Sequence, residues 1–126
     1  MLTEDEAFTY DDLKTEFEHL ERISLTSQDP YFLGLYSGAL FNVGNLSSSI
    51  DMSERVSQSQ NTETGAVEGA QTSITSSNGE SLLLETTSIA IINWLNQDSS
   101  LFSQEIDLGV EFVLSKIKDG GRFGST

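Results

Sequence analysis

The sequence predicts an all-α fold. Apolar residues recur at spacings of three and four in most of the chain, which places them along one face of a helix. Residues that suit helix ends, such as Ser, Asp, Pro and Gly, flank these periodic segments. One long polar connection, around residues 60–80, interrupts the pattern and is predicted to lie outside regular helix. With 126 residues, the chain corresponds to one domain or to part of one.

The N-terminal part, residues 1–28, is predicted to be an acidic tail followed by one helix. The apolar stripe of this helix is Tyr10, Leu13, Phe17 and Leu20. Asp11 and Asp12 stand in its first turn, where the helix dipole favours negative charge. His19 lies off the stripe and is expected at the surface rather than in a metal or catalytic site.

The next helix has clear boundaries. Asp29 suits the N-cap, Pro30 suits the first helical position and Gly44 suits the position after the C-cap. Its predicted apolar arc is Tyr31, Phe32, Leu35, Tyr36, Ala39, Leu40 and Val43. Gly34 and Gly38 lie inside this helix, where each glycine costs up to about 1 kcal/mol relative to alanine. We therefore expect a neighbouring helix to pack closely against them.

Residues 47–62 predict a short helix that is capped by Ser49. Its thin apolar face is Ile50, Met52 and Val56. In the polar connection that follows, Val67 and Ile74 are the few apolar anchors. A loop of this length in a compact domain is functional, ordered on itself or disordered, and the sequence leaves the three possibilities open.

Two more helices are predicted towards the C-terminus. The first carries the apolar stripe Ile89, Ile92 and Leu95. Leu82 to Leu84 are expected to form a buried segment that leads into this helix. The second is capped by Ser103 and ends at Gly120 and Gly121. Its apolar stripe is Ile106, Val110, Val113, Leu114 and Ile117.

Composition excludes several classes of function. The formal net charge of −14 repels phosphate backbones and anionic membrane surfaces, so neither nucleic acid nor a membrane is an expected partner. The chain has no cysteine and one histidine, which excludes thiol catalysis, thiolate metal sites and His-pair metal sites. It also lacks a nucleophile elbow, a phosphate loop and an apolar run of about 18 residues. We therefore expect no enzyme activity, no cofactor, no metal and no membrane insertion.

Three motifs, in order, resemble the C-terminal half of the thioester domain in the alpha-2-macroglobulin and complement family. The first is "DPYFLGLYSGALFNVGN", residues 29–45, which is similar to a helix that opens with Asp-Pro-Tyr. The second is "SITSSNGESLLLETTSIAIINWL", residues 73–95, in which a polar turn leads to Glu-Thr-Thr and an aliphatic helix. The third is "GGRFGST", residues 120–126, which is similar to a turn before a further helix.

The resemblance implies part of an α/α toroid, a ring of helical hairpins, over residues 29–126. It carries over scaffold residues only: Asp29, Pro30 and Gly44 as helix boundaries, Glu85, Thr86 and Thr87 as the start of an inner helix, and Gly120, Gly121, Phe123 and Gly124 as the turn. The family's reactive centre, a Gly-Cys-Gly-Glu-Gln run, lies upstream of the matched region. Because this chain has no cysteine, it cannot form the thioester, and no catalytic residue carries over.

The resemblance implies a scaffold role in a secreted or periplasmic protein that traps proteases. The expected partners are the rest of a macroglobulin-like parent chain and, through it, the target proteases. The chain itself shows no signal peptide, since "MLTEDEAF" is acidic and has no apolar core. If the chain is an arc of a ring, Phe123 and the stripe of the last helix should be partly uncovered.

Two other functions stay open at this point. One is a free-standing acidic helical module that binds a partner protein. The other is an enzyme on the same toroid architecture, such as a terpenoid cyclase, a prenyltransferase or a glycoside hydrolase. The first two of these enzymes need Asp-rich or zinc-ligand sets that the sequence lacks, and the third needs a buried pair of carboxylates that the sequence does not mark.

Overall fold

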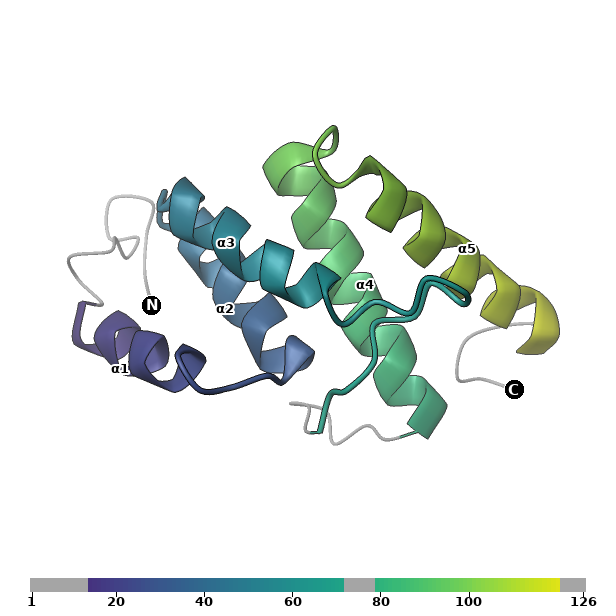
Figure 1. The fold of residues 1–126 in the computed structure, drawn as a ribbon, viewed down its shortest axis with the longest axis horizontal. Coiled ribbons are helices and arrows are strands. Elements are labelled where there is room, and N and C mark those ends of the chain that lie inside the picture. Colours follow the sequence, from purple (N-terminus) through teal and green to yellow (C-terminus); the bar gives the residue numbers. More distant parts are fainter. Residues whose placement is uncertain (1–13, 72–78, 121–126) are drawn as a thin grey trace, which may run out of the picture.

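The chain is all-helical where the computed structural model describes it, in residues 14–71 and 79–120. These two ranges contain five helices and no strand, which confirms the all-α prediction. The helices are α1 (Lys14–Ser24), α2 (Pro30–Asn42), α3 (Leu46–Ser57), α4 (Gly79–Asp98) and α5 (Ser103–Gly120) (Figure 1).

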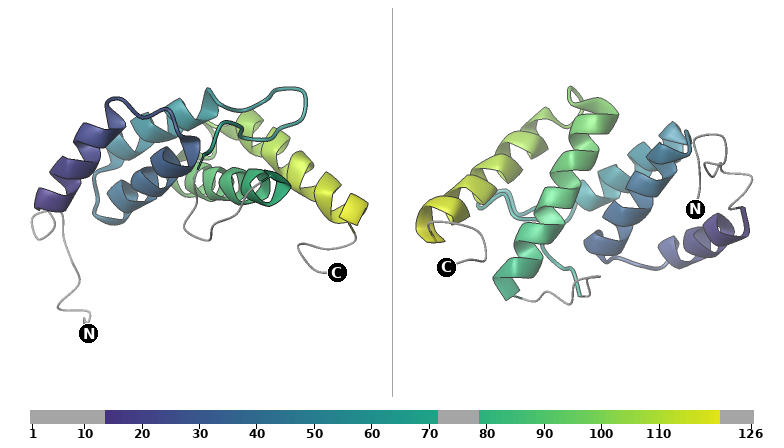
Figure 2. Two further views of the ribbon diagram at one scale, coloured as in Figure 1. Left: turned by 90° about the horizontal axis from the view of Figure 1, so that it is seen from below. Right: turned by 180° about the vertical axis from the view of Figure 1, so that it is seen from behind.

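Four of the helices form two successive antiparallel hairpins. Helices α2 and α4 run in one direction, and α3 and α5 run in the opposite direction (Figure 1). In the left-hand view of Figure 2, α2 and α4 lie in a lower layer, and α3 and most of α5 lie above them. The central helix is α4, which packs against α2, α3 and α5. The described residues thus form two hairpins and one preceding helix, which do not by themselves close a ring.

The boundaries of α2 are those that the sequence predicts. The Asp29 side chain accepts a hydrogen bond of 2.9 Å from the Tyr31 N–H, and Pro30 is the first helical residue. Gly44 follows the C-cap with φ of +88°, in the left-handed region that glycine reaches without strain. The cap and the turn together fix the length of this helix.

The predicted start of α3 is wrong. Asn45, not Ser49, stands at the N-cap position, and α3 begins at Leu46. Ser49 lies one turn inside the helix and is fully buried against α2. Its hydroxyl is therefore used between helices rather than at a helix end.

The start of α4 also differs from the prediction. This helix begins at Gly79, so Glu85, Thr86 and Thr87 lie inside it rather than at its start. The side chains of Leu82 to Leu84, predicted to precede the helix, are half-buried on its first turns.

Two of the three residues in the predicted apolar stripe of α4 face water, whereas Ile89 is half-buried. Ile92 and Leu95 are 56% and 53% exposed. The buried residues of α4 are Thr86, Thr87, Ala90, Ile91, Asn93 and Trp94. Because α4 carries apolar residues on all sides, their spacing alone does not select the face that becomes buried.

A similar error affects the predicted arc of α2. Leu35, expected in the core, is 37% exposed, whereas Leu33, which the arc omits, is 2% exposed. Tyr31, Tyr36 and Leu40 are buried as predicted. This helix too is apolar nearly all round, and the position of α4 decides which side is covered.

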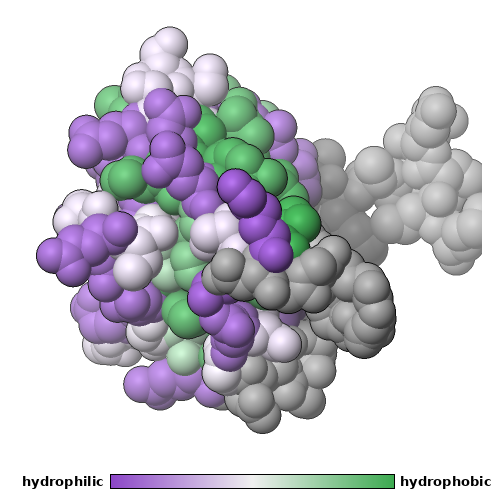
Figure 3. Space-filling view, turned by 90° about the vertical axis from the view of Figure 1, so that its right-hand side faces the viewer, coloured by the Kyte–Doolittle hydropathy of each residue, from purple (hydrophilic) through white to green (hydrophobic). Residues whose placement is uncertain are grey.

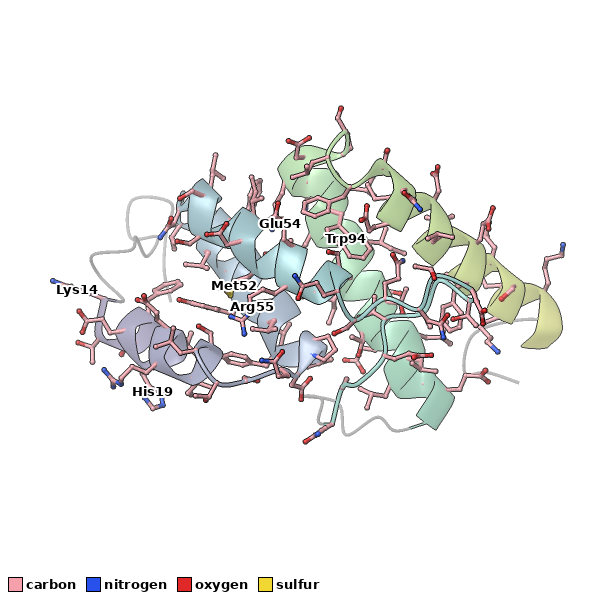
Figure 4. All side chains as sticks on the ribbon, in the orientation of Figure 1. Lys14, His19, Met52, Glu54, Arg55 and Trp94 are labelled. Carbon is pink, nitrogen blue, oxygen red and sulfur yellow. The ribbon has the colours of Figure 1, made fainter. Side chains whose placement is uncertain are left out.

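The main core surrounds Trp94. Its indole ring stacks on Phe102 with ring centroids 5.8 Å apart, and its N–H donates to the Ser53 carbonyl over 3.3 Å (Figure 4). The buried members of this core are Leu33, Val56, Val67, Ala90, Ile91, Trp94 and Phe102. A second, smaller cluster of Phe17, Tyr36 and Leu40 attaches α1 to α2.

The close helix contact predicted at the interior glycines of α2 is confirmed. A Cβ on Gly34 would lie 3.0 Å from Cγ2 of Ile89. A Cβ on Gly38 would lie 3.2 Å from Oδ1 of Asn93. The glycines therefore let α4 approach the backbone of α2, which offsets their cost in helix propensity.

The described part of the long polar connection, residues 58–71, is ordered on itself. The Asn61 N–H donates to the Ala66 carbonyl over 2.8 Å, and an isolated antiparallel bridge pairs Gln60 with Val67. Val67 is fully buried, as expected of an apolar anchor. Ile74, the other predicted anchor, lies outside the described residues.

Candidate functional site

Two of the sequence motifs meet in space. The Tyr31 hydroxyl on α2 donates a hydrogen bond of 2.7 Å to Oε2 of Glu85 on α4, although the residues are 54 positions apart. Tyr31 is only 4% exposed, so this contact lies largely out of water. The Asp-Pro-Tyr and Glu-Thr-Thr motifs therefore form one junction between the first helices of the two hairpins.

The long connection joins the same junction. The Val67 N–H donates to the Thr87 hydroxyl over 2.8 Å, and both residues are fully buried. The second carboxylate oxygen of Asp29 accepts from the Gln71 N–H over 3.2 Å. Asp29 thus has two functions, since it caps α2 and also holds the end of the described loop. The Thr87 hydroxyl thereby satisfies a backbone N–H that would otherwise lack a partner in a buried setting.

The other predicted scaffold residues are divided between this junction and the rest of the chain. Pro30 is at the junction, but Gly44 lies at the opposite end of α2. Gly120 is the last residue of α5. Gly121, Phe123 and Gly124 lie outside the described residues. The side chain of Thr86 is buried, and its hydroxyl has no hydrogen-bond partner among the residues that the structure describes.

A buried cluster of hydroxyl groups, which sequence reasoning missed, joins α2, α3 and α4. The Ser37 hydroxyl donates to the Ser49 carbonyl, and the Ser49 hydroxyl donates to the Ser37 carbonyl, each over 2.7 Å. The side-chain nitrogen of Gln97 donates to both hydroxyls, over 2.7 Å to Ser37 and 2.6 Å to Ser49. Because each hydroxyl has one proton, the Ser53 hydroxyl must be the donor in its 2.8 Å contact with Ser37.

The sequence contains one sign of this cluster. Ser49 and Ser53 are four positions apart and so lie on one face of α3, as Asn93 and Gln97 do on α4. Ser37 stands between the two interior glycines of α2. Such a row of small and polar residues within apolar helices indicates a helix interface that is held by hydrogen bonds. The cluster consists of neutral groups and offers positioning rather than acid–base chemistry.

The α4–α5 hairpin carries an exposed apolar groove. It encloses about 240 Å³ and is lined by Ser88, Ile91, Ile92, Val110, Val113 and Leu114. Figure 3, which views this end of the molecule, shows hydrophobic residues gathered in a band between hydrophilic ones. The expected uncovering of the last helix is seen at Val110 and Leu114, which are 38% and 51% exposed.

A smaller apolar groove, of about 180 Å³, lies between α1 and α2. Its lining is Leu20, Phe32, Leu35, Tyr36 and Ala39. A polar pocket of about 200 Å³ lies among α1, α2 and α3, and Arg55, which lines it, donates to the Ser27 carbonyl over 2.8 Å. Arg55 thereby holds the end of α1 against α3, and Figure 4 shows it beside Met52.

Neither a metal site nor a membrane span is found in the part of the chain that the structure describes. Within residues 14–71 and 79–120, no group of three or more His, Asp or Glu side chains is placed to hold a metal ion. Over the same ranges, no helix is long and apolar enough to cross a bilayer.

Comparisons with known protein families, with curated proteins and with solved structures found no match for this chain.

Proposed function

We propose that this chain is a scaffold portion of an α/α toroid of the thioester-domain type, in an alpha-2-macroglobulin-like protein. In this proposal the chain has no reactive centre and contributes part of the rigid wall around the parent protein's reactive site. The parent is a secreted or periplasmic protein that traps proteases. The partners of the chain are the rest of the parent and, through it, the trapped protease.

The observation that carries this proposal is the contact between Tyr31 and Glu85. Two of the three motifs that together carry the resemblance, Asp-Pro-Tyr and Glu-Thr-Thr, supply the two ends of one partly buried hydrogen bond. Thr87 and Asp29 of the same motifs bind the connection between the hairpins. Scaffold motifs of a helical array are expected to join successive hairpins in this manner.

The uncovered groove of the α4–α5 hairpin supports the same proposal. Each hairpin in an array is covered by the next, so a hairpin at an edge has an apolar face without a neighbour. Ile92 and Leu114 are both more than half exposed on such a face. A ring that continues past α5 would cover them.

Reading the gene on both sides of the segment that encodes this chain tests the proposal. We expect an upstream Gly-Cys-Gly-Glu-Gln run, a secretion signal and further helical hairpins. An upstream region without a cysteine motif and without a secretion signal would contradict the proposal. It would favour the alternative, a free-standing acidic helical module, for which the charge of −14 and the exposed groove are the supporting observations.

A further inference from the structure

We propose that the α4–α5 groove binds an amphipathic helix of a partner protein, with an apolar stripe in the groove and a basic flank over α5. This inference does not depend on the resemblance to macroglobulins. It is based on the shape, exposure and charge of this hairpin, and it goes with the alternative function, a free-standing module whose groove is covered by a separate protein rather than by a further hairpin of the same chain.

The shape of the groove suits a helix. Val110 and Leu114 are four positions apart and so form one row along α5. Ile91 and Ile92 form the facing wall on α4. The groove between these rows is open to solvent, and the ridge of a third helix can pack into a groove of this kind.

The exposed apolar side chains of this hairpin indicate that a further element is needed to cover it. Nine large apolar side chains are exposed in the described part of the chain, and five of them belong to the α4–α5 hairpin. The five are Ile92, Leu95, Leu101, Val110 and Leu114, at 38–56% exposure. Helix α4 is apolar on the side that faces its hairpin partners and on the side that faces water. Helices that are apolar all round are normally buried on both sides.

The acidic residues beside the groove favour a basic partner. Asp107 and Glu111 are exposed, lie four positions apart on α5, and flank the row that Val110 and Leu114 form. Lys118 lies beyond them near the end of the helix. Asp107 and Glu111 form an acidic rim beside the groove. A second copy of the chain would bring another net charge of −14 to this rim, whereas the basic flank of a partner helix would complement it. A basic amphipathic helix is therefore favoured over self-association.

Two synthetic helical peptides of about 18 residues test the proposal, at a length that supports a helix in water. Both have the same leucine stripe, with lysines on one flank in the first and glutamates there in the second. We expect fluorescence anisotropy with the full chain to show that the basic peptide binds about tenfold or more tightly. This preference should shrink as salt is added, because the rim is exposed.

One single substitution and one pair of substitutions, each with a matched control, test whether the peptide binds in the groove. Leu114→Ser should weaken the basic peptide about tenfold, since the groove loses a large apolar contact. Leu46→Ser should leave its affinity unchanged, because Leu46 is equally exposed, at 52% against 51%, but lies on α3. The pair Asp107→Lys with Glu111→Lys should reverse the preference between the two peptides. The control pair Glu18→Lys with Glu54→Lys makes the same change in net charge away from the groove.

Three results would overturn the proposal. One is an unchanged affinity in Leu114→Ser while circular dichroism shows the chain folded. Another is an equal loss of affinity in the two charge-reversal pairs, which would show attraction to the whole acidic surface rather than to this rim. The third is sedimentation that shows a dimer of the chain, disrupted by Leu114→Ser, which would make a second copy the occupant of the groove.

Discussion

The hydroxyl of Tyr31 donates to the carboxylate of Glu85 over 2.7 Å and thereby joins the first helix of each hairpin. Both residues lie near the contacts that Thr87 and Asp29 make with the connection between the hairpins, of which the Thr87 contact is buried and the Asp29 contact is exposed. The junction is therefore a point at which α2, α4 and the loop depend on one another. Its energetic coupling can be measured.

A double-mutant cycle tests the Tyr31–Glu85 contact. Tyr31→Phe and Glu85→Gln should each lower the free energy of unfolding, and the coupling between them should be about 1–2 kcal/mol, since a hydrogen bond to a carboxylate is stronger than a neutral one. Urea denaturation of the four proteins gives the coupling. In the control cycle, Tyr31→Phe with Glu111→Gln, the two effects should add. Additive effects with Glu85→Gln as well would show that the negative charge of Glu85 adds nothing to the contact, because the glutamine oxygen can still accept the hydrogen bond.

Gly65 should tolerate a side chain far less well than Gly44. The two glycines have nearly the same φ, +87° and +88°, but a Cβ on Gly65 would lie 1.9 Å from the Leu108 carbonyl oxygen, whereas nothing lies within 4 Å of one on Gly44. Gly44→Ala should cost about 1 kcal/mol for the left-handed backbone alone. Gly65→Ala should cost about 3 kcal/mol or more, because a backbone atom cannot rotate away. Equal unfolding midpoints for the two variants would contradict the placement of the loop against α5.

The buried hydroxyl cluster should make Ser49 essential to stability. Ser49→Ala removes the donor to the Ser37 carbonyl and one acceptor of Gln97, so we expect a loss of about 1–3 kcal/mol in the free energy of unfolding. Ser47→Ala, on the exposed side of the same helix, is the control and should be neutral or slightly stabilising. A Ser49→Ala variant as stable as the Ser47→Ala variant would show that the cluster is not formed.

The exposed groove should bind a hydrophobic dye. Replacing both Ile92 and Leu114 by serine should remove most of the dye fluorescence, since these are two of the most exposed side chains that line the groove. Replacing Leu25 and Leu46, which are exposed elsewhere, should leave the signal nearly unchanged. A chain that binds no dye at low or high salt would show that the hairpin covers its own apolar face, which would count against the proposed array.

Local rules predicted the local features of this fold. The boundaries of α2 depend on Asp29, Pro30 and Gly44, whose preferences are set by the backbone within one turn. The need for close packing at Gly34 was also visible, because an interior glycine has a cost that something must offset. These statements required no knowledge of which helices are neighbours.

The features that depend on neighbours could not be predicted. Ile92 has an apolar spacing typical of a core residue and yet faces water, because α2 and α5 pack on other sides of α4. Ser49 has the side chain of a cap, but the approach of Ser37 buries it. The junction at Tyr31 and Glu85 joins positions so distant in the chain that no periodic pattern relates them.

The loop after α3 links α3 to α5. Gly65 lies against the Leu108 carbonyl of α5, and the side chain of Gln60, in the loop after α3, donates to the Glu105 carbonyl over 2.9 Å. The loop thus contacts α5 through main-chain atoms and a single amide, and the outward side chains of α3 and α5 take no part in these contacts. Sequence change on the outer surface can therefore accumulate without altering the curvature with which one hairpin follows the other.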